Sequence, residues 1–128
     1  MKIAVIDDDP MTLKLVEKKL TEKGHVVTSL ADPVKALEII EDKDFDVIIS
    51  DVMMPGISGL TLLSICKQFY YKSTPVILIS SLDQAKVIAA SVQLGADEYI
   101  TKPINFSELF LKIDRAFGKY ISSRSERQ

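Results

Sequence analysis

Residues 47–56 read Val-Ile-Ile-Ser-Asp-Val-Met-Met-Pro-Gly, and this stretch decides the fold. Its first three residues are β-branched and apolar without polar alternation, which is typical of a parallel strand covered on both faces. Asp51 follows where the strand ends, because Pro55 and Gly56 stop regular structure. Aspartate also ends strands in ordinary turns through local backbone hydrogen bonds. The stretch alone therefore leaves a structural and a chemical interpretation of Asp51 open.

Composition limits the classes of protein to which the chain can belong. The 128 residues, 47% of them hydrophobic, are enough for one domain with its own core. A net charge of −2 argues against a protein that binds nucleic acid by neutralising phosphates. Apolar runs are short and an acidic cluster begins at Asp7, so we expect no membrane span, no signal peptide and a cytoplasmic location. The single cysteine, Cys66, excludes an intrachain disulfide, and we expect it to be a half-buried hydrophobe.

Strand-like and helix-like patterns alternate along the whole chain. Short apolar strands are expected at 3–6, 25–30, 47–50, 76–79 and 99–101. Aspartate followed by proline at 9–10 and 32–33 predicts the starts of two helices, and three more are expected from 58–59, from Asp83 to Gly95, and from Phe106. Five such units predict a doubly wound α/β fold, a parallel sheet flanked by five helices. We expect the domain to span residues 1–121, with 122–128 a polar tail or a truncated linker.

Polar residues follow four of the expected strands at their carboxyl ends, where ligands bind in such sheets. They are Asp7, Asp8, Asp51, Ser80 and Lys102. Three neighbouring carboxylates repel one another unless a cation compensates them, and hard oxygen ligands select Mg²⁺ or Mn²⁺. Lys102 and Ser80 can stabilise the charge of a transferring phosphoryl group. Asp51 is then a candidate covalent nucleophile.

These residues resemble the receiver domain of two-component response regulators, in particular single-domain chemotaxis-type regulators, over residues 2–121. The matching positions are the pair Asp7-Asp8, Asp51 within the segment 50–59, Ser80, and Lys102-Pro103. The resemblance implies a flavodoxin-like sheet of order 2-1-3-4-5. It also implies that Asp51 accepts a phosphoryl group from a phosphohistidine on a histidine kinase or a phosphotransfer protein.

The resemblance further implies a set of magnesium ligands and a peptide geometry. Asp8, Asp51 and the backbone carbonyl of Met53 would bind Mg²⁺ directly, and Asp7 would act through a water molecule. The peptide bond before Pro103 is expected to be cis. Asp9, the third acid of the run, is assigned instead to capping the helix that begins at Pro10.

A conformational switch is implied by two more positions. Ser80 would close on the phosphoryl group, and Tyr99 would fill the space that Ser80 leaves; the less favoured alternative is that Tyr99 is an amphipathic residue at the rim of a core. The helix from 83 to 95 is apolar nearly all round. Its outer side is either a partner surface or simply tolerates small residues. Together with the strand at 99–101 and the last helix it would form a face for a homodimer or a target protein, and we expect no direct contact with nucleic acid or membrane.

Two apolar positions depart from the family pattern. Met53 and Leu82 stand where polar side chains help to orient a hydrolytic water in the family. We therefore expect slow self-dephosphorylation. The domain would catalyse only its own phosphorylation and dephosphorylation, and would not otherwise be an enzyme.

Two other functions compete with the receiver. Asp7 to Met11 resembles the D-x-D-x-[TV] motif of magnesium-dependent phosphohydrolases of the haloacid dehalogenase type, except at Met11. An interaction module with a receiver fold that works without phosphorylation is the other alternative. Retention of all five polar residues at the strand ends favours the receiver.

Overall fold

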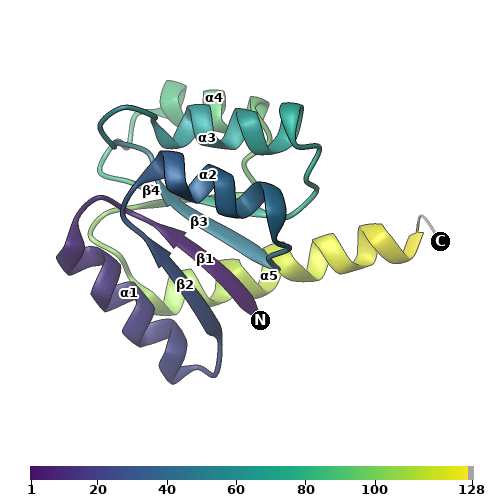
Figure 1. Ribbon diagram of the computed structural model, residues 1–128, viewed down its shortest axis with the longest axis horizontal. Coiled ribbons are helices and arrows are strands. Elements are labelled where there is room, and N and C mark those ends of the chain that lie inside the picture. The colour runs from purple at the N-terminus through teal and green to yellow at the C-terminus, as the bar shows by residue number, and fades with distance from the viewer. Residues whose placement is uncertain (127–128) are drawn as a thin grey trace.

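The computed structural model describes residues 1–126 as a five-stranded parallel sheet with helices on both faces (Figure 1). The strands stand in the order β2-β1-β3-β4-β5. Their bounds are β1 Lys2–Ile6, β2 Val26–Leu30, β3 Val47–Asp51, β4 Val76–Ser80 and β5 Glu98–Thr101. The predicted doubly wound α/β class and strand order are confirmed.

The helices connect successive strands and divide between the two faces of the sheet. They are α1 Pro10–Glu22, α2 Pro33–Asp42, α3 Gly59–Ser64 with its π-helical continuation η1 Ile65–Phe69, α4 Ala85–Gln93 and α5 Phe106–Glu126. Helices α1 and α5 cover one face, and α2, α3 and α4 cover the other (Figure 1). The core therefore has two layers, one on each side of the sheet.

The central strands are apolar because both of their faces are covered. All five residues of β3 and of β4 are buried. Ile49 and Ile77 pack toward α1 and α5, whereas Ile48 and Leu78 pack toward α2 and α3. Burying each such side chain contributes about 1.5–3 kcal/mol, so this middle of the sheet is its most stable part. β2 lies at the edge of the sheet and is only partly buried.

Side-chain caps begin four helices where the sequence predicts them, and at α5 the cap is Asn105, which accepts a hydrogen bond from the Glu108 N–H. Asp9 accepts a hydrogen bond from the Met11 N–H, and Asp32 accepts one from the Val34 N–H. Ser58 accepts one from the Thr61 N–H at the start of α3. The expected start at Asp83 is wrong: α4 begins at Ala85, after Gln84 in an extended conformation. A run of polar residues before a helix fixes its start poorly when none of them supplies the cap.

Three further expectations from helical spacing need correction. Cys66 is fully buried rather than half-buried, and burial raises the pKa of its thiol to about 11. Helical spacing would place Phe69 beside Leu62 on the inner side of α3, but the π-helical turn of η1 rotates Phe69 outward, where it is 71% exposed. α5 continues to Glu126, five residues into the segment expected to be a polar tail; residues 127 and 128 lie outside the described part.

Gly59 fixes the distance between α3 and the end of β3. Its N–H donates to the Val52 carbonyl at 2.9 Å, so the backbone of the helix start lies directly on the strand end. A Cβ at this position would stand 2.2 Å from the backbone oxygen of Asp51. Only glycine allows this approach, which therefore helps to place the Asp51 carboxylate.

We predict that Gly59→Ala destabilises the domain by about 1–3 kcal/mol, because backbone must move to admit the methyl group. Gly118→Ala is the matched control, since a Cβ there meets no described atom within 4 Å in the middle of α5. It should instead stabilise by about 0.5–1 kcal/mol, because alanine favours helix. Urea denaturation of both variants measures the difference. Equal stability of the two variants would contradict the close approach.

Candidate functional site

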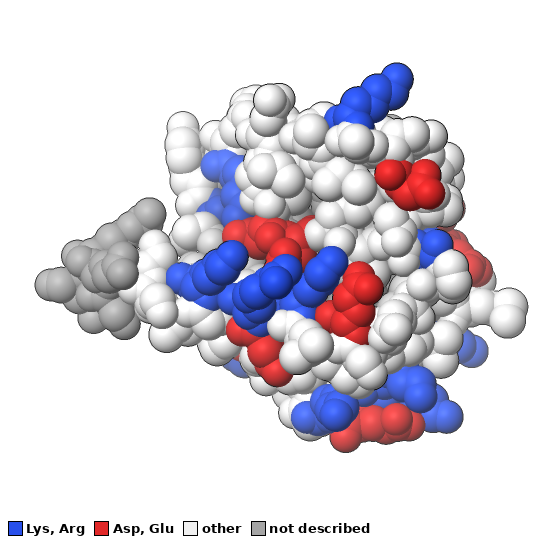
Figure 2. All heavy atoms as spheres, turned by 180° about the vertical axis from the view of Figure 1, so that it is seen from behind, with Lys and Arg blue, Asp and Glu red and all other residues white. Residues whose placement is uncertain are grey.

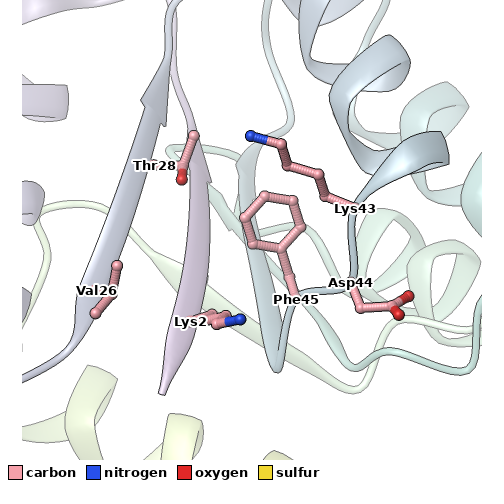
Figure 3. A pocket seen from close by; sticks show the side chains of 6 residues that line it. All are labelled: Lys2, Val26, Thr28, Lys43, Asp44 and Phe45. Atoms are coloured by element: carbon pink, nitrogen blue, oxygen red, sulfur yellow. The ribbon is translucent and has the colours of Figure 1, made fainter.

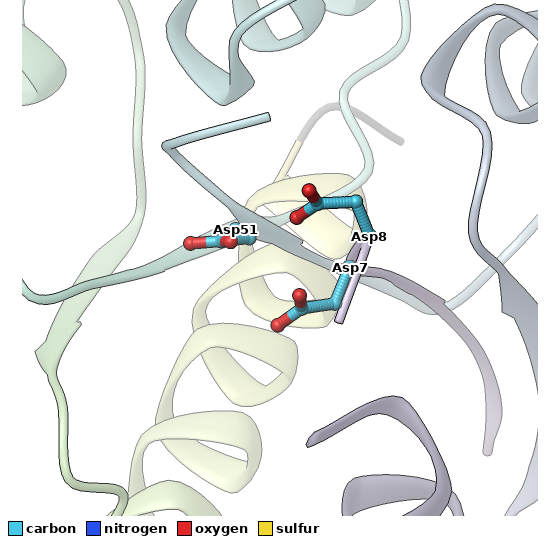
Figure 4. Close-up of side chains that lie close together, drawn as sticks. All are labelled: Asp7, Asp8 and Asp51. Atoms are coloured by element: carbon cyan, nitrogen blue, oxygen red, sulfur yellow. The ribbon is translucent and has the colours of Figure 1, made fainter. Parts of the chain in front are cut away.

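Three carboxylates gather at the carboxyl edge of the sheet. Asp7 and Asp8 follow β1 directly, and Asp51 is the last residue of β3. The two strands are paired in parallel, with Ile6 opposite Ser50, so the residues that follow emerge side by side. One carboxylate oxygen from each aspartate lies within 4.8 Å of the others (Figure 4). The parallel register alone therefore assembles the acidic group that the sequence predicts.

Lys102 is placed against two of these carboxylates by β5. Its Nζ lies 3.5 Å from an oxygen of Asp7 and 3.5 Å from an oxygen of Asp51. The Lys102 N–H donates to the Ser80 carbonyl at 2.8 Å, and the Lys102–Pro103 peptide bond is cis, as the resemblance implies. With all groups ionised, three carboxylates and one ammonium leave an excess of two negative charges. A divalent cation would balance that excess.

The protein environment disfavours the charged form of Asp51. The side chain is nearly buried, and this burial raises its pKa above the ordinary value of 3.8, with the Asp7 carboxylate adding to the effect. Lys102 and the Met53 backbone N–H act in the opposite direction without cancelling the shift. Without further positive charge, keeping the buried Asp51 carboxylate ionised therefore lowers the free energy of unfolding.

The donor set fits magnesium better than zinc or copper. The group offers only carboxylate oxygens, and Asp8 is exposed while Asp7 and Asp51 are buried, so the group opens toward solvent on one side. Mg²⁺ favours a few carboxylates together with water molecules, whereas zinc and copper sites generally include histidine or cysteine. The ligand assigned to the Met53 carbonyl stays a prediction.

A second set of contacts joins Ser80 to Tyr99. Ser80 is fully buried, and its Oγ accepts a hydrogen bond from the Leu82 N–H at 3.0 Å. The Tyr99 hydroxyl donates to the Leu82 carbonyl at 2.7 Å. The backbone of Leu82 thus bridges the two residues expected to form the switch. The sequence did not reveal this link, because a backbone contact leaves no trace in the type of side chain.

A hollow at the opposite edge of the sheet is separate from the acidic group. It has a volume of about 490 Å³ and is lined by Lys2, Val26, Thr28, Lys43, Asp44 and Phe45. Apart from Thr28 in the middle of β2, these residues lie at or before the amino ends of the strands. The Asp44 carboxylate points away from the Lys43 ammonium (Figure 3). Because its charged groups do not converge, the hollow is a weaker candidate site than the carboxyl edge.

Comparison with known proteins identifies relatives of this arrangement. A family model described as the response regulator receiver domain matches residues 3–114. The transcriptional regulatory protein TcrA of Mycobacterium tuberculosis is 34% identical over 115 residues, which cover 88% of this chain and 44% of that protein. The chain spans about half the length of the curated relatives it matches.

Solved structures share the fold closely. The receiver domain of the Francisella response regulator 1452 is 34% identical, with a TM-score of 0.85, and the match covers 92% of this chain and 97% of that one. The chemotaxis protein CheY4 of Vibrio cholerae is 29% identical with a TM-score of 0.83, over 90% and 97% of the two chains.

Within residues 1–126, no helix has both the length and the apolar character needed to cross a membrane.

We predict that Asp51→Asn raises the melting temperature in EDTA at pH 7 by roughly 2–5 °C, because it removes a buried charge that Asp7 repels. The raised pKa means that the folded state binds more protons than the unfolded state above pH 3.8. The free energy of unfolding of the parent therefore falls as pH rises from 3.8 through the raised pKa, and it stays low at higher pH. In acid Asp51 is protonated and uncharged, so the Asp51→Asn substitution should no longer raise the melting temperature there.

Thermal melts with and without MgCl₂ measure this effect. The metal should raise the melting temperature of the parent more than that of Asp51→Asn. Asp44→Asn is the control, because the Asp44 side chain is 98% exposed and its removal should change little. A parent that is as stable as the variant in EDTA would contradict the repulsion.

Proposed function

The chain belongs to the response regulator receiver family, and we propose that it receives a phosphoryl group on the Asp51 carboxylate. It is a receiver domain of two-component signalling. The observation that carries the assignment to Asp51 is its place: a nearly buried carboxylate that ends the central strand, within 4.8 Å of two more carboxylates and 3.5 Å from Lys102.

The proposed reaction is an in-line transfer between the donor and Asp51. An Asp51 oxygen forms a bond to phosphorus while the bond from phosphorus to the imidazole nitrogen of a phosphohistidine breaks, and that nitrogen keeps the electron pair. Carboxylates are established nucleophiles of this kind. Lys102, already 3.5 Å from Asp51, is in position to hold the growing charge on the phosphoryl oxygens. Ser80 would supply a hydroxyl donor to the same group.

Receiver domains bind Mg²⁺ at an aspartate cluster, and this chain has such a cluster. We assign direct contacts to Asp8, Asp51 and the Met53 carbonyl, with Asp7 acting through a water molecule. When bound, the metal supplies positive charge that neutralises the carboxylates and the incoming phosphoryl oxygens. The excess of two negative charges at the site supports this assignment.

Phosphorylation would act through the bridge at Leu82. The phosphoryl group adds about 1.5–2 negative charges and three acceptor oxygens, which attract the Ser80 hydroxyl. Rotation of Ser80 would remove the acceptor of the Leu82 N–H, and Leu82 also holds the Tyr99 hydroxyl. Shifting a population from 1:99 to 99:1 needs about 5.5 kcal/mol, and a few charge-assisted hydrogen bonds of about 1.5–3 kcal/mol each can supply it.

The surface that would read the switch is formed by α4, β5 and α5. Val92 of α4 is 61% exposed and Leu111 of α5 is 71% exposed, and Leu111 lines a hollow of about 530 Å³ along α5. Lys112 pairs with Glu108, and Arg115 pairs with Glu98. From behind, basic side chains form a row that acidic side chains border (Figure 2). A surface with apolar residues surrounded by charges of both signs is suited to bind a second copy of the domain or a target protein.

The family supports the kinds of partner proposed for this chain. Receiver domains interact with kinases and effector domains. For this chain we propose a histidine kinase or a phosphotransfer protein as donor, a cytoplasmic location, and no reaction on other substrates.

Two hydrogen bonds of Asp9 count against the competing phosphohydrolase. In the motif D-x-D, Asp9 would be the second acid, but its carboxylate accepts hydrogen bonds from the Thr12 hydroxyl at 2.6 Å and the Met11 N–H at 3.3 Å. The Thr12 hydrogen bond is the largest cause that holds the pKa of Asp9 below its ordinary value. A lowered pKa is unsuited to a general acid.

We predict that acetyl phosphate with Mg²⁺ adds one phosphoryl group to the domain and that Asp51→Asn abolishes the addition. Asp9→Asn is the matched control and should keep it, because Asp9 caps α1. Mass spectrometry of the intact protein and of its peptides measures both. A label on Asp7 would instead support the hydrolase, and labelling of Asp51→Asn at the parent rate would contradict the proposal.

We also predict that the phosphorylated domain keeps its label for minutes or longer, because Met53 and Leu82 offer no polar side chain to orient water. Met53→Asn should shorten this lifetime, whereas Met11→Asn, also on an exposed methionine, should not. Loss of label from the purified phosphoprotein, followed by radioactive phosphate, gives the rates. Half-lives of seconds for the parent would overturn the inference.

A further inference from the structure

The segment that follows α3 departs from ordinary helix geometry. In η1 the Tyr70 N–H donates to the Ile65 carbonyl at 3.0 Å, and the Lys72 N–H donates to the Cys66 carbonyl at 2.9 Å. Tyr71 has a φ of 53°, a left-handed conformation that bulky residues rarely adopt. Single π-helical turns and such backbone outliers occur preferentially at functional sites.

The unusual backbone turns two aromatic rings into solvent. Phe69 is 71% exposed and Tyr71 is 85% exposed, whereas Tyr70 between them packs partly against the core under α2 and α3. Core packing therefore accounts for Tyr70 but not for its neighbours. An ordinary helical end would have directed Phe69 toward the inner side instead.

The neighbouring end of α2 is acidic. α2 is in contact with η1, and the exposed side chains of Glu38, Glu41 and Asp42 lie in its C-terminal half. Burial raises the pKa of Tyr70, and the carboxylates of Glu41, Glu38 and Asp42 add to the shift. Glu41 and Asp42 stand in the last turn of α2, where the partial negative charge of the helix end has the same sign as theirs. The lysines of the η1 segment already have partners: Lys67 donates to the Thr74 carbonyl, and Lys72 pairs with Asp44.

We propose that these residues form a docking surface for an arginine-bearing segment of another protein. The α2–η1 patch comprises Glu38, Glu41, Asp42, Phe69, Tyr70 and Tyr71. A guanidinium is planar, so it can stack on an aromatic ring while it donates two hydrogen bonds to a carboxylate. Exposed rings beside carboxylates that form no ion pair within residues 1–126 are complementary to that group, and less so to the compact ammonium of lysine.

The position of the patch separates it from the phosphorylation site. Helices α2 and α3 follow β2 and β3, parallel strands that end at the same edge of the sheet as the aspartates, so both helices end at the opposite edge. A partner on the α2–η1 patch can therefore bind while a donor occupies Asp51. The proposal does not depend on the proposed phosphotransfer.

A peptide titration followed by ¹⁵N NMR tests the proposal. The probe is a capped alanine-based helical peptide that carries arginines at i, i+4 spacing, and excess MgCl₂ keeps it from the aspartate cluster. We expect saturable shifts confined to residues 38–42 and 65–72. They should weaken at 1 M salt, where the Debye length is only roughly 3 Å. The matched lysine peptide should bind more weakly.

Two variants locate the binding energy. Phe69→Ala with Tyr71→Asn removes both rings while asparagine tolerates the left-handed backbone, and affinity should fall by about two- to fivefold for each ring. Leu111→Ala removes an equally exposed apolar side chain on α5 and should not change affinity. Glu41→Gln keeps the rings and should also weaken binding. Unchanged spectra elsewhere show that the variants remain folded.

Other outcomes would overturn the proposal. These are shifts that do not saturate, shifts centred on another surface, equal affinity for the lysine peptide, or no effect of the double variant. Shifts of residues 65–72 that appear with protein concentration alone would mean that a second copy covers the patch instead.

Discussion

Mutual repulsion of three carboxylates at the carboxyl edge of the sheet is the constraint around which this domain is built. Asp7 and Asp51 are nearly buried, and Lys102 is the cation that lies 3.5 Å from both. Such a group is tolerated because the apolar middle of β3 and β4 holds the strand ends in register. The stability of the core thus offsets a local electrostatic cost, and that cost makes the site responsive to metal and to phosphoryl groups.

Much of this arrangement was predictable from the sequence, because it depends on residue types in order along the chain. The apolar run 47–49 predicted the central strand, and Asp9-Pro10 and Asp32-Pro33 predicted two helix starts. A parallel sheet then brings polar residues that follow its strands to one edge. The acidic group and Lys102 could therefore be placed together without coordinates.

What the sequence did not predict depends on backbone geometry. The contact of Gly59 with Asp51 and the bridge at Leu82 involve backbone atoms, which side-chain patterns do not describe. Phe69 was misplaced because spacing arguments assume an α-helix, and η1 has a wider turn. The start of α4 was misplaced because Gln84 supplies no cap bond within the described structure.

The burial of Cys66 has a practical consequence. Thiol reagents attack the thiolate, and this thiol is inaccessible with its pKa raised to about 11, so little of it is ionised near neutral pH. A cysteine introduced at the surface would react with a maleimide far faster than Cys66. Fluorophores or spin labels can therefore be attached at chosen positions to follow motion of the domain while its native cysteine stays in place.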